Sequence, residues 1–191
     1  MGWGLLGAVW GVLGVELMLG GAVLRLTPVG LEPLLEGGLS GLHLAAYAAS
    51  LAFFLYTEGY RAFQKGFSPR VAARAHALRR APTWGRTLFA PLFCMGFFGA
   101  SARRRRVTWL LTVGLVGLIL LVRMVPQPWR GAIDLGVVAA LIYGMVVLAW
   151  SFAVGFYRPL PVGPDLPEDE TDRPDGVPLQ PDLEALRGEA A

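Results

Sequence analysis

The chain has 191 residues, of which 54% are apolar and only 16% are charged. Soluble domains carry about 25% charged residues, and the apolar residues here stand in long blocks, so the composition argues against an ordinary soluble domain. The single cysteine, Cys94, excludes an internal disulfide bond. It lies in an apolar run, and we expect a buried free thiol that packs as a small apolar side chain.

The net charge of +3 hides two regions of opposite sign. Residues 1–157 carry a net charge of +9, and residues 158–191 carry −6. The boundary predicts a basic transmembrane helical domain, 1–157, followed by an acidic, proline-rich tail, 158–191. The tail composition predicts a disordered cytoplasmic segment.

Four stretches are long and apolar enough to cross a bilayer core of about 30 Å, which requires about 20 residues of helix. They are residues 3–24, 39–57, 107–125 and 132–157. Because the bilayer core offers no water to the backbone, each stretch must be helical. The predicted fold class is all-α, an integral membrane helical bundle with four transmembrane helices.

Residues 87–101 form a shorter apolar stretch that contains Pro91. Fifteen residues of helix span about 22 Å, which is typical of a re-entrant or interfacial segment. We therefore expect an embedded segment, and a fifth span is the alternative.

The basic side chains predict the orientation. The stretch 58–86, expected to be a loop, carries seven basic residues, and a second group follows at 103–106. Basic loops stay in the cytoplasm, so we expect both termini there. The ratio of sixteen arginines to one lysine is typical of GC-rich bacterial genomes and favours a bacterial inner (plasma) membrane.

Within the predicted cytoplasmic loop, Ser68-Pro69 has the pattern of a helix start. Val71, Ala75 and Leu78 then fall on one face, and basic residues cover much of the rest. This pattern predicts a short amphipathic helix that lies on the membrane surface.

Small residues repeat along three of the predicted spans. Close contact between helices in lipid relies on such residues, so we expect tight helix packing along these stripes; a path lined by small residues is the alternative. The stripes are Gly4, Gly7, Gly11, Gly14 and Gly21; Gly41, Ala45, Ala49 and Ala52; and Ala132, Gly136, Ala140 and Gly144.

Four ionisable residues at membrane depth form a candidate polar site: Glu16, His43, Arg123 and Asp134. Such residues are costly in the bilayer and are functional candidates by default. The site could bind a cation, a proton or a small polar solute. The alternative is structural, with Asp134 paired to Arg123 or Arg130 and Glu16 protonated and hydrogen-bonded.

The basic residues form a candidate surface for anionic lipid headgroups or for a partner, and fixing topology is the alternative role. Its members are Arg61, Lys65, Arg70, Arg74, Arg79, Arg80, Arg103, Arg104, Arg105 and Arg106. The expected partners are the lipid bilayer and a membrane protein or a second copy of the chain. No recognition motif for nucleic acid accompanies the charge.

Signatures of enzymes are absent from the sequence. His43 and His76 are the only histidines and stand on different segments, so we expect no metal or haem site. No nucleophile-elbow, phosphate-loop or dinucleotide motif is present. We expect no cofactor and no catalytic residues.

Two segments, 56–71 and 126–131, resemble those of a family of uncharacterised bacterial multi-pass membrane proteins. The resemblance implies a membrane location and transfers no activity. Two function classes remain. One is a non-enzymatic scaffold, assembly or lipid-interacting component; the other is a small oligomeric transporter or proton-linked permease that uses Glu16 and Asp134.

Overall fold

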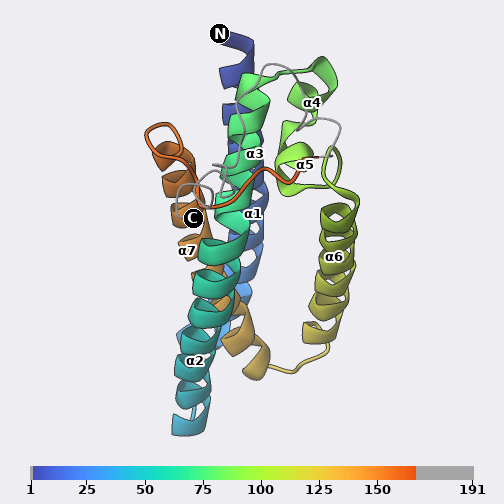
Figure 1. Cartoon of the computed structure of the whole chain (residues 1–191). Helices are drawn as coiled ribbons and strands as arrows, with labels where there is room; N and C mark the ends of the chain where they lie inside the picture. Colours follow the sequence, from blue (N-terminus) through green and yellow to red (C-terminus); the bar gives the residue numbers. More distant parts are fainter. Residues whose placement is uncertain (1, 167–191) are drawn as a thin grey trace, which may run out of the picture.

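A computed structural model describes residues 2–166, and within them the chain is helical and has no strand. The predicted tail begins at residue 158. Residues 158–166 are described and are held by hydrogen bonds to Pro164 and Asp165, so the disorder predicted for them is wrong; the rest of the tail lies outside the described residues. Figure 1 shows a bundle of long helical rods packed side by side and, apart from it, the helix formed by residues 102–122. The segments are α1 (Gly2–Glu36), α2 (Gly41–Phe54), η1 (Leu55–Phe67), α3 (Ser68–Arg80), α4 (Trp84–Leu88), α5 (Ala90–Met95), α6 (Ala102–Val122) and α7 (Trp129–Val154).

The first helix is longer than the span predicted from the sequence, which ended at residue 24. It continues to Glu36 through Pro28 and Pro33, although an interior proline removes one backbone hydrogen bond. Pro33 cannot donate to the carbonyl of Val29, and Gln127 Nε2 donates to that oxygen instead, at 3.2 Å. A side chain from the α6–α7 turn thus replaces the donor that the proline lacks.

The second rod runs without a break from Gly41 to Arg80, so the loop predicted from residue 58 is wrong over residues 58–67, which are helical. The helix predicted at Ser68 has the expected extent, but it continues η1 rather than starting afresh. The segment η1 is a π-helix, and the amide of Ser68 bonds to the carbonyl of Phe63. The wider π-helical turn lies directly before Pro69. A proline interrupts the regular hydrogen bonds of an α-helix, and a π-helical turn is one way in which a helix accommodates such an interruption.

The short apolar stretch 87–101 does not form a spanning helix. It contains the end of α4, the helix α5 and a turn closed by Gly96 in the left-handed conformation. Both short helices pack against α1, and α5 also packs against α3. This arrangement agrees with the prediction that the segment does not cross as a fifth span.

The glycine stripe of α1 is a packing surface at Gly4, Gly7, Gly11 and Gly14, as predicted, but not at Gly21, where nothing lies within 4 Å of an added carbon. A methyl group added at Gly4 would overlap the backbone of Arg79, and one added at Gly14 would overlap Pro91. At Gly11, a methyl carbon would lie 2.7 Å from the sulfur of Cys94. The buried thiol therefore fills the space above a glycine, which confirms the structural role expected for Cys94.

The stripe of α7 is also packed, whereas that of α2 is not. Gly136 faces Ser50 and Phe54, and Gly144 lies against the ring of Phe63. In α2, Ala45, Ala49 and Ala52 are exposed. Tyr47 is the buried residue of α2 instead, and its hydroxyl donates to the carbonyl of Gly30 in α1 at 3.1 Å.

Three of the described helices, α1, α6 and α7, are long and apolar enough to cross a membrane. The α-helical part of the second predicted span, α2, has only 14 residues, so four spans do not follow from helix length alone. Large apolar side chains are exposed along α1, α6 and α7. Exposure on this scale indicates that an apolar medium surrounds them, which suggests a helical membrane bundle.

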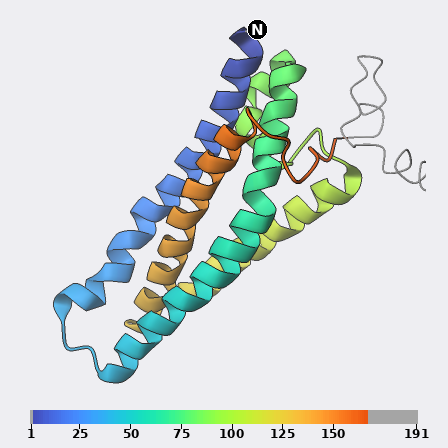
Figure 2. The same cartoon turned by 60° about the vertical axis from the view of Figure 1, so that its left-hand side comes forward.

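Helix α6 differs from the others because Thr108 is its only buried residue. Figure 1 shows α6 separated from the other long helices, and Figure 2 shows that it runs obliquely to them and passes behind the α2–α3 rod. Its first turns contact the segment after α5, where the ring of Phe97 meets the edge of Trp109 at a centroid distance of 5.2 Å. The remaining turns are open on all sides.

We predict that Gly144→Leu destabilises the bundle and that Gly117→Leu does not. A side chain at position 144 would overlap the ring of Phe63, whereas nothing lies within 4 Å of the added carbon at Gly117. Overpacking costs about 1–3 kcal/mol, so the melting temperature of the first variant in mild detergent should fall by several degrees. Equal melting temperatures for the two variants would contradict the packing described here.

Candidate functional site at the basic end of the bundle

Arg74 is the most enclosed charged residue in the described part of the chain, with 2% of its surface exposed. Its guanidinium donates only to backbone carbonyls. Nε donates to Phe93 O at 2.6 Å, and Nη2 donates to Phe98 O and Gly99 O at 2.9 and 2.8 Å. Nη1 donates to Pro164 O at 2.8 Å. The planar fork of arginine suits this divergent set of acceptors.

The carbonyls converge because the segment after α5 turns sharply. Gly96 and Gly99 have φ angles of +85° and +56°, which side-chain-bearing residues rarely adopt. A methyl carbon at Gly99 would also lie 2.9 Å from the ring of Phe93. That ring stacks under the guanidinium, with its centroid 4.2 Å from Arg74 Cζ.

Burial lowers the pKa of Arg74 to about 10, so the side chain stays charged at neutral pH. An isolated buried cation is costly unless polar groups surround it; here carbonyl dipoles supply that compensation. The prediction that Arg74 belongs to an accessible lipid-binding surface is therefore wrong. The prediction that its helix lies on a membrane surface is wrong as well, because Val71, Ala72 and Ala75 are buried between other elements.

The segment that follows α7 is held at the same place. We call residues 158–166 the strap. In addition to the bond from Arg74 to Pro164, the amide of Ser101 donates to Asp165 O at 2.9 Å, and Leu166 packs against the core that contains Val71 and Phe93. The strap therefore joins α3, the turn after α5 and the start of α6.

The arginine cluster, defined as Arg103, Arg104, Arg105 and Arg106, occupies the first turns of α6. Ser101 caps this helix, since its hydroxyl oxygen accepts from the amide of Arg104. Four cations thus stand at a helix N-terminus, which already carries partial positive charge. The end of α6 attracts anions for both reasons.

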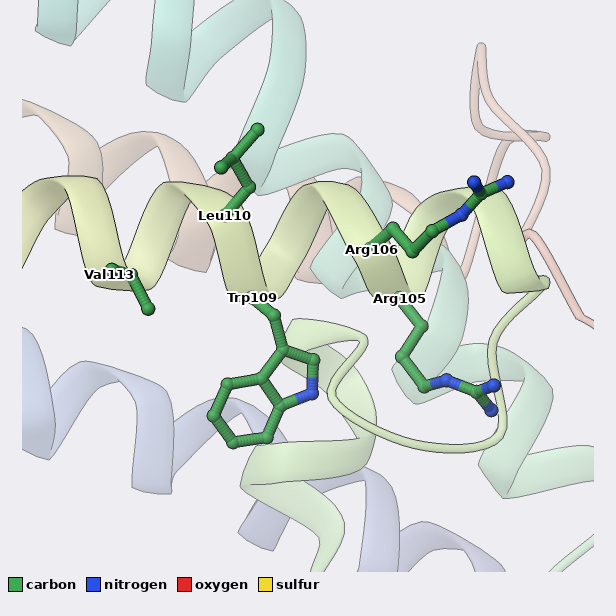
Figure 3. Close-up of a pocket in the computed structure, with 5 residues that line it drawn as sticks. All are labelled: Arg105, Arg106, Trp109, Leu110 and Val113. Atoms are coloured by element: carbon green, nitrogen blue, oxygen red, sulfur yellow. The ribbon is translucent and has the colours of Figure 1, made fainter.

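A shallow depression follows the cluster along α6. Figure 3 shows Arg105 and Arg106 at one end and Trp109, Leu110 and Val113 along the next turns. Cationic groups are thus followed directly by an apolar surface on the same helix. This order matches an amphiphile with an anionic head.

The other basic residues expected on the surface are more dispersed. Arg61, Lys65, Arg79 and Arg80 are exposed along η1 and at the end of α3, and Arg70 is half-buried. Lys65 lies over the ring of Tyr60, and Arg79 lies over that of Phe156. The structure thus separates the predicted surface into a compact group on α6 and scattered positions on the second rod.

The four residues of the candidate intramembrane site are not brought together. Asp134 pairs with Arg130, at 3.4 Å, rather than with Arg123. His43 belongs to the capping box of α2 with Ser40, and its ring meets the edge of Trp129. Glu16 has one carboxylate oxygen buried without a hydrogen-bond partner among the described residues.

Glu16 also lies at a different depth from Asp134. Gly30 of α1 packs against Leu135, and fourteen residues of helix separate Gly30 from Glu16, about 21 Å at 1.5 Å per residue. Arg123 is exposed at the end of α6. A single site made of all four residues would need a rearrangement of the bundle.

Sequence reasoning missed the residues that bind the buried arginine and the end of α6. The carbonyls of Phe98, Gly99 and Pro164 carry no side-chain signal, and Ser101 stood at the edge of the short apolar stretch. The pattern Ser101-Ala102-Arg103-Arg104 before an apolar run was the available sign of a helix N-cap. Among residues 2–166, no group of three or more His, Cys, Asp or Glu could hold a metal ion.

Comparison of the chain with protein-family models, with curated proteins and with solved structures finds no match.

We predict that Arg74→Met lowers the free energy of unfolding by about 1–3 kcal/mol, the usual cost of leaving a buried hydrogen-bond acceptor without its partner. The change leaves several buried carbonyls without donors. Arg74→Lys should be milder because an ammonium group restores some of the hydrogen bonds. Thermal unfolding in detergent measures the effect, and Arg80→Met, at an exposed position, is the control. A melting temperature of Arg74→Met equal to that of Arg80→Met would contradict the role assigned to Arg74.

A second prediction concerns pH and His76, which is buried in α3 with Nε2 3.0 Å from Phe152 O. Burial lowers the pKa of His76, and the charges of Arg79 and Arg80 lower it further, although the hydrogen bond to Phe152 opposes the shift. The folded protein therefore holds a neutral imidazole at a pH where the unfolded chain, with a pKa near 6.5, is already protonated. The stability that neutral His76 contributes is fully present above about pH 6.5. It is lost as the pH falls from there towards the lower pKa that His76 has in the folded protein.

The measurement is the melting temperature between pH 7.5 and 5 for the wild type and for His76→Gln, whose amide can still donate to Phe152. The wild type should lose more stability on acidification than this variant. Arg61→Gln, at an exposed position of η1, is the matched control and should lose as much stability on acidification as the wild type. Parallel curves for the wild type and His76→Gln would rule out this role of His76.

Proposed function

We propose that the protein is a non-enzymatic membrane component that binds anionic lipid through the arginine cluster of α6. The observation that carries the proposal is the depression along α6, in which Arg105 and Arg106 precede Trp109, Leu110 and Val113. A phosphate-bearing headgroup would bind the guanidinium groups, which form strong charge-assisted hydrogen bonds with phosphate. The acyl chains would lie along the apolar turns.

The isolation of α6 supports this proposal. Its side chains are exposed on all faces beyond Thr108, so lipids can approach it without displacing another helix. Trp109 stands one turn from the arginines, and tryptophan side chains favour the headgroup level of a bilayer. A soluble anion such as free phosphate would gain nothing from these apolar turns, so we assign the site to lipid.

The proposal also covers how the chain is oriented across the membrane. Most of the basic residues lie on η1, α3 and the start of α6, whereas Glu32 and Glu36 lie at the opposite end of α1, where Arg123 and Arg130 also lie. We propose that α2 and η1 together provide a fourth span, that the basic end is cytoplasmic, and that both termini lie on that side. A bacterial inner membrane and a disordered acidic tail are part of this proposal, supported by the arginine-rich composition and by the tail sequence.

A proton-linked permease receives less support from the geometry. That function requires ionisable residues that share a path, and Glu16 lies about 21 Å along α1 from the level of Asp134. The pairing of Asp134 with Arg130 instead has a structural explanation, because adjacent turns of one helix bring opposite charges together.

We predict that Arg105→Gln/Arg106→Gln weakens binding to nanodiscs that contain phosphatidylglycerol by about tenfold or more, since each juxtamembrane basic residue contributes about 1 kcal/mol near an anionic surface. Arg61→Gln/Arg80→Gln removes two exposed charges elsewhere and is the matched control. Retained lipid, measured by native mass spectrometry, should fall for the first variant and stay near the wild-type level for the control. Equal losses in both variants would show that only overall charge matters, and the α6 site would be abandoned.

A further inference from the structure

The strap brings the C-terminal part of the chain to the start of the arginine cluster. The bond from the amide of Ser101 to Asp165 O joins the strap to the residue that caps α6. Asp165 also lies close enough to Arg74 and Arg104 to interact electrostatically with both. The chain that follows Leu166 therefore begins close in space to the arginine cluster.

The sequence that follows is strongly acidic. Residues 168–175, here called the acidic run, contain five acidic residues and one arginine, a net charge of −4. The first three of these acids are Glu168, Asp169 and Glu170. They stand two to four residues beyond Leu166, which an extended chain covers within about 14 Å.

We propose that the acidic run docks on the arginine cluster and competes there with anionic lipid headgroups. The tether gives the run a local concentration in the millimolar range, as short linkers do, so modest attraction between individual charges is enough to occupy the site. The charges of the cluster and the run are opposite and nearly equal in number. The inference rests on the proposed function for its consequence, the regulation of lipid binding, but the docking itself can be measured without lipid.

The anchor of the strap is essential to this arrangement. Arg74 holds Pro164 through a partly buried hydrogen bond, and Leu166 packs against the core beside α3. Both contacts lie outside the arginine cluster, so the cluster remains available to a ligand. The strap therefore anchors the chain just before the acidic run, and from this anchor the run can reach the cluster.

The first experiment tests docking in detergent without lipid. Cys94 is replaced by alanine, and cysteines are placed at Ala102, beside the cluster, and at Thr171, within the acidic run. A short bismaleimide then alkylates both thiols. The rate of intramolecular cross-linking should fall at least threefold at 0.5 M salt, where screening is strong. It should fall similarly when Glu168→Gln, Asp169→Asn and Glu170→Gln are combined.

The matched control combines Asp182→Asn, Glu184→Gln and Glu189→Gln, which removes three acids farther along the tail. It should cross-link at nearly the unmodified rate. A rate that responds neither to salt nor to the first triple change would overturn docking, because the strap alone would then explain the proximity. Equal losses in the two triple variants would also overturn it in the specific form stated here.

The second experiment measures the affinity of the full chain for phosphatidylglycerol nanodiscs. The triple change at 168–170 should raise this affinity about threefold to tenfold, as expected when a few surface ion pairs are lost, and the triple change at 182–189 should not. Unchanged affinity with intact charge-dependent cross-linking would overturn the competition but not the docking. If neither the wild type nor any variant binds anionic lipid, the proposed function fails, and the cross-linking result still decides the docking.

Discussion

A guanidinium group enclosed by backbone carbonyls holds the basic end of this molecule together. Arg74 reaches from α3 to the turn after α5 and to the strap, and it reinforces the apolar contacts that Val71, Phe93 and Leu166 make in the same place. The helices α4 and α5 have five and six residues, too few to be stable alone. Their position is fixed because the carbonyls at the end of α5 need donors and the buried cation needs acceptors. The hydrogen bonds of the guanidinium all go to backbone carbonyls, so the interaction constrains backbone geometry as well as charge.

A second constraint is the close approach of long helices. Glycines in α1 and α7 let neighbouring backbones, rings and a thiol come within contact distance, which is the main source of helix association in an apolar solvent. The prolines of α1 show how such packing tolerates an irregular sequence. Gln127 supplies the donor that Pro33 lacks, and the partner is 94 positions away in the chain. Local rules that end a helix at proline are therefore overridden by a contact that only the assembled bundle provides.

The sequence predicted those features that depend on local pattern. The apolar stretches, the glycine stripe of α1, the small-residue stripe of α7 and the buried Cys94 all follow from periodicity and composition. The features that it missed depend on contacts between distant segments. Arg74 looks like its neighbours Arg70 and Arg79 in the sequence, yet it alone meets five carbonyls. In the same way, Glu16 and Asp134 look like partners because both are costly in lipid, but helix lengths place them at different levels.

The helix that packs least well carries the site proposed for lipid binding, and the two properties have a common cause. The arginine cluster is kept out of the core because four adjacent cations cannot all find buried acceptors as Arg74 does. The apolar turns that follow are then free to contact lipid rather than protein. The start of α6 is attached to α5, where the hydroxyl of Thr108 donates to Met95 O, and to the strap through the bond from Ser101 to Asp165. A ligand or segment that binds the cluster therefore acts where α6 is attached, and the firmly packed rods would change little.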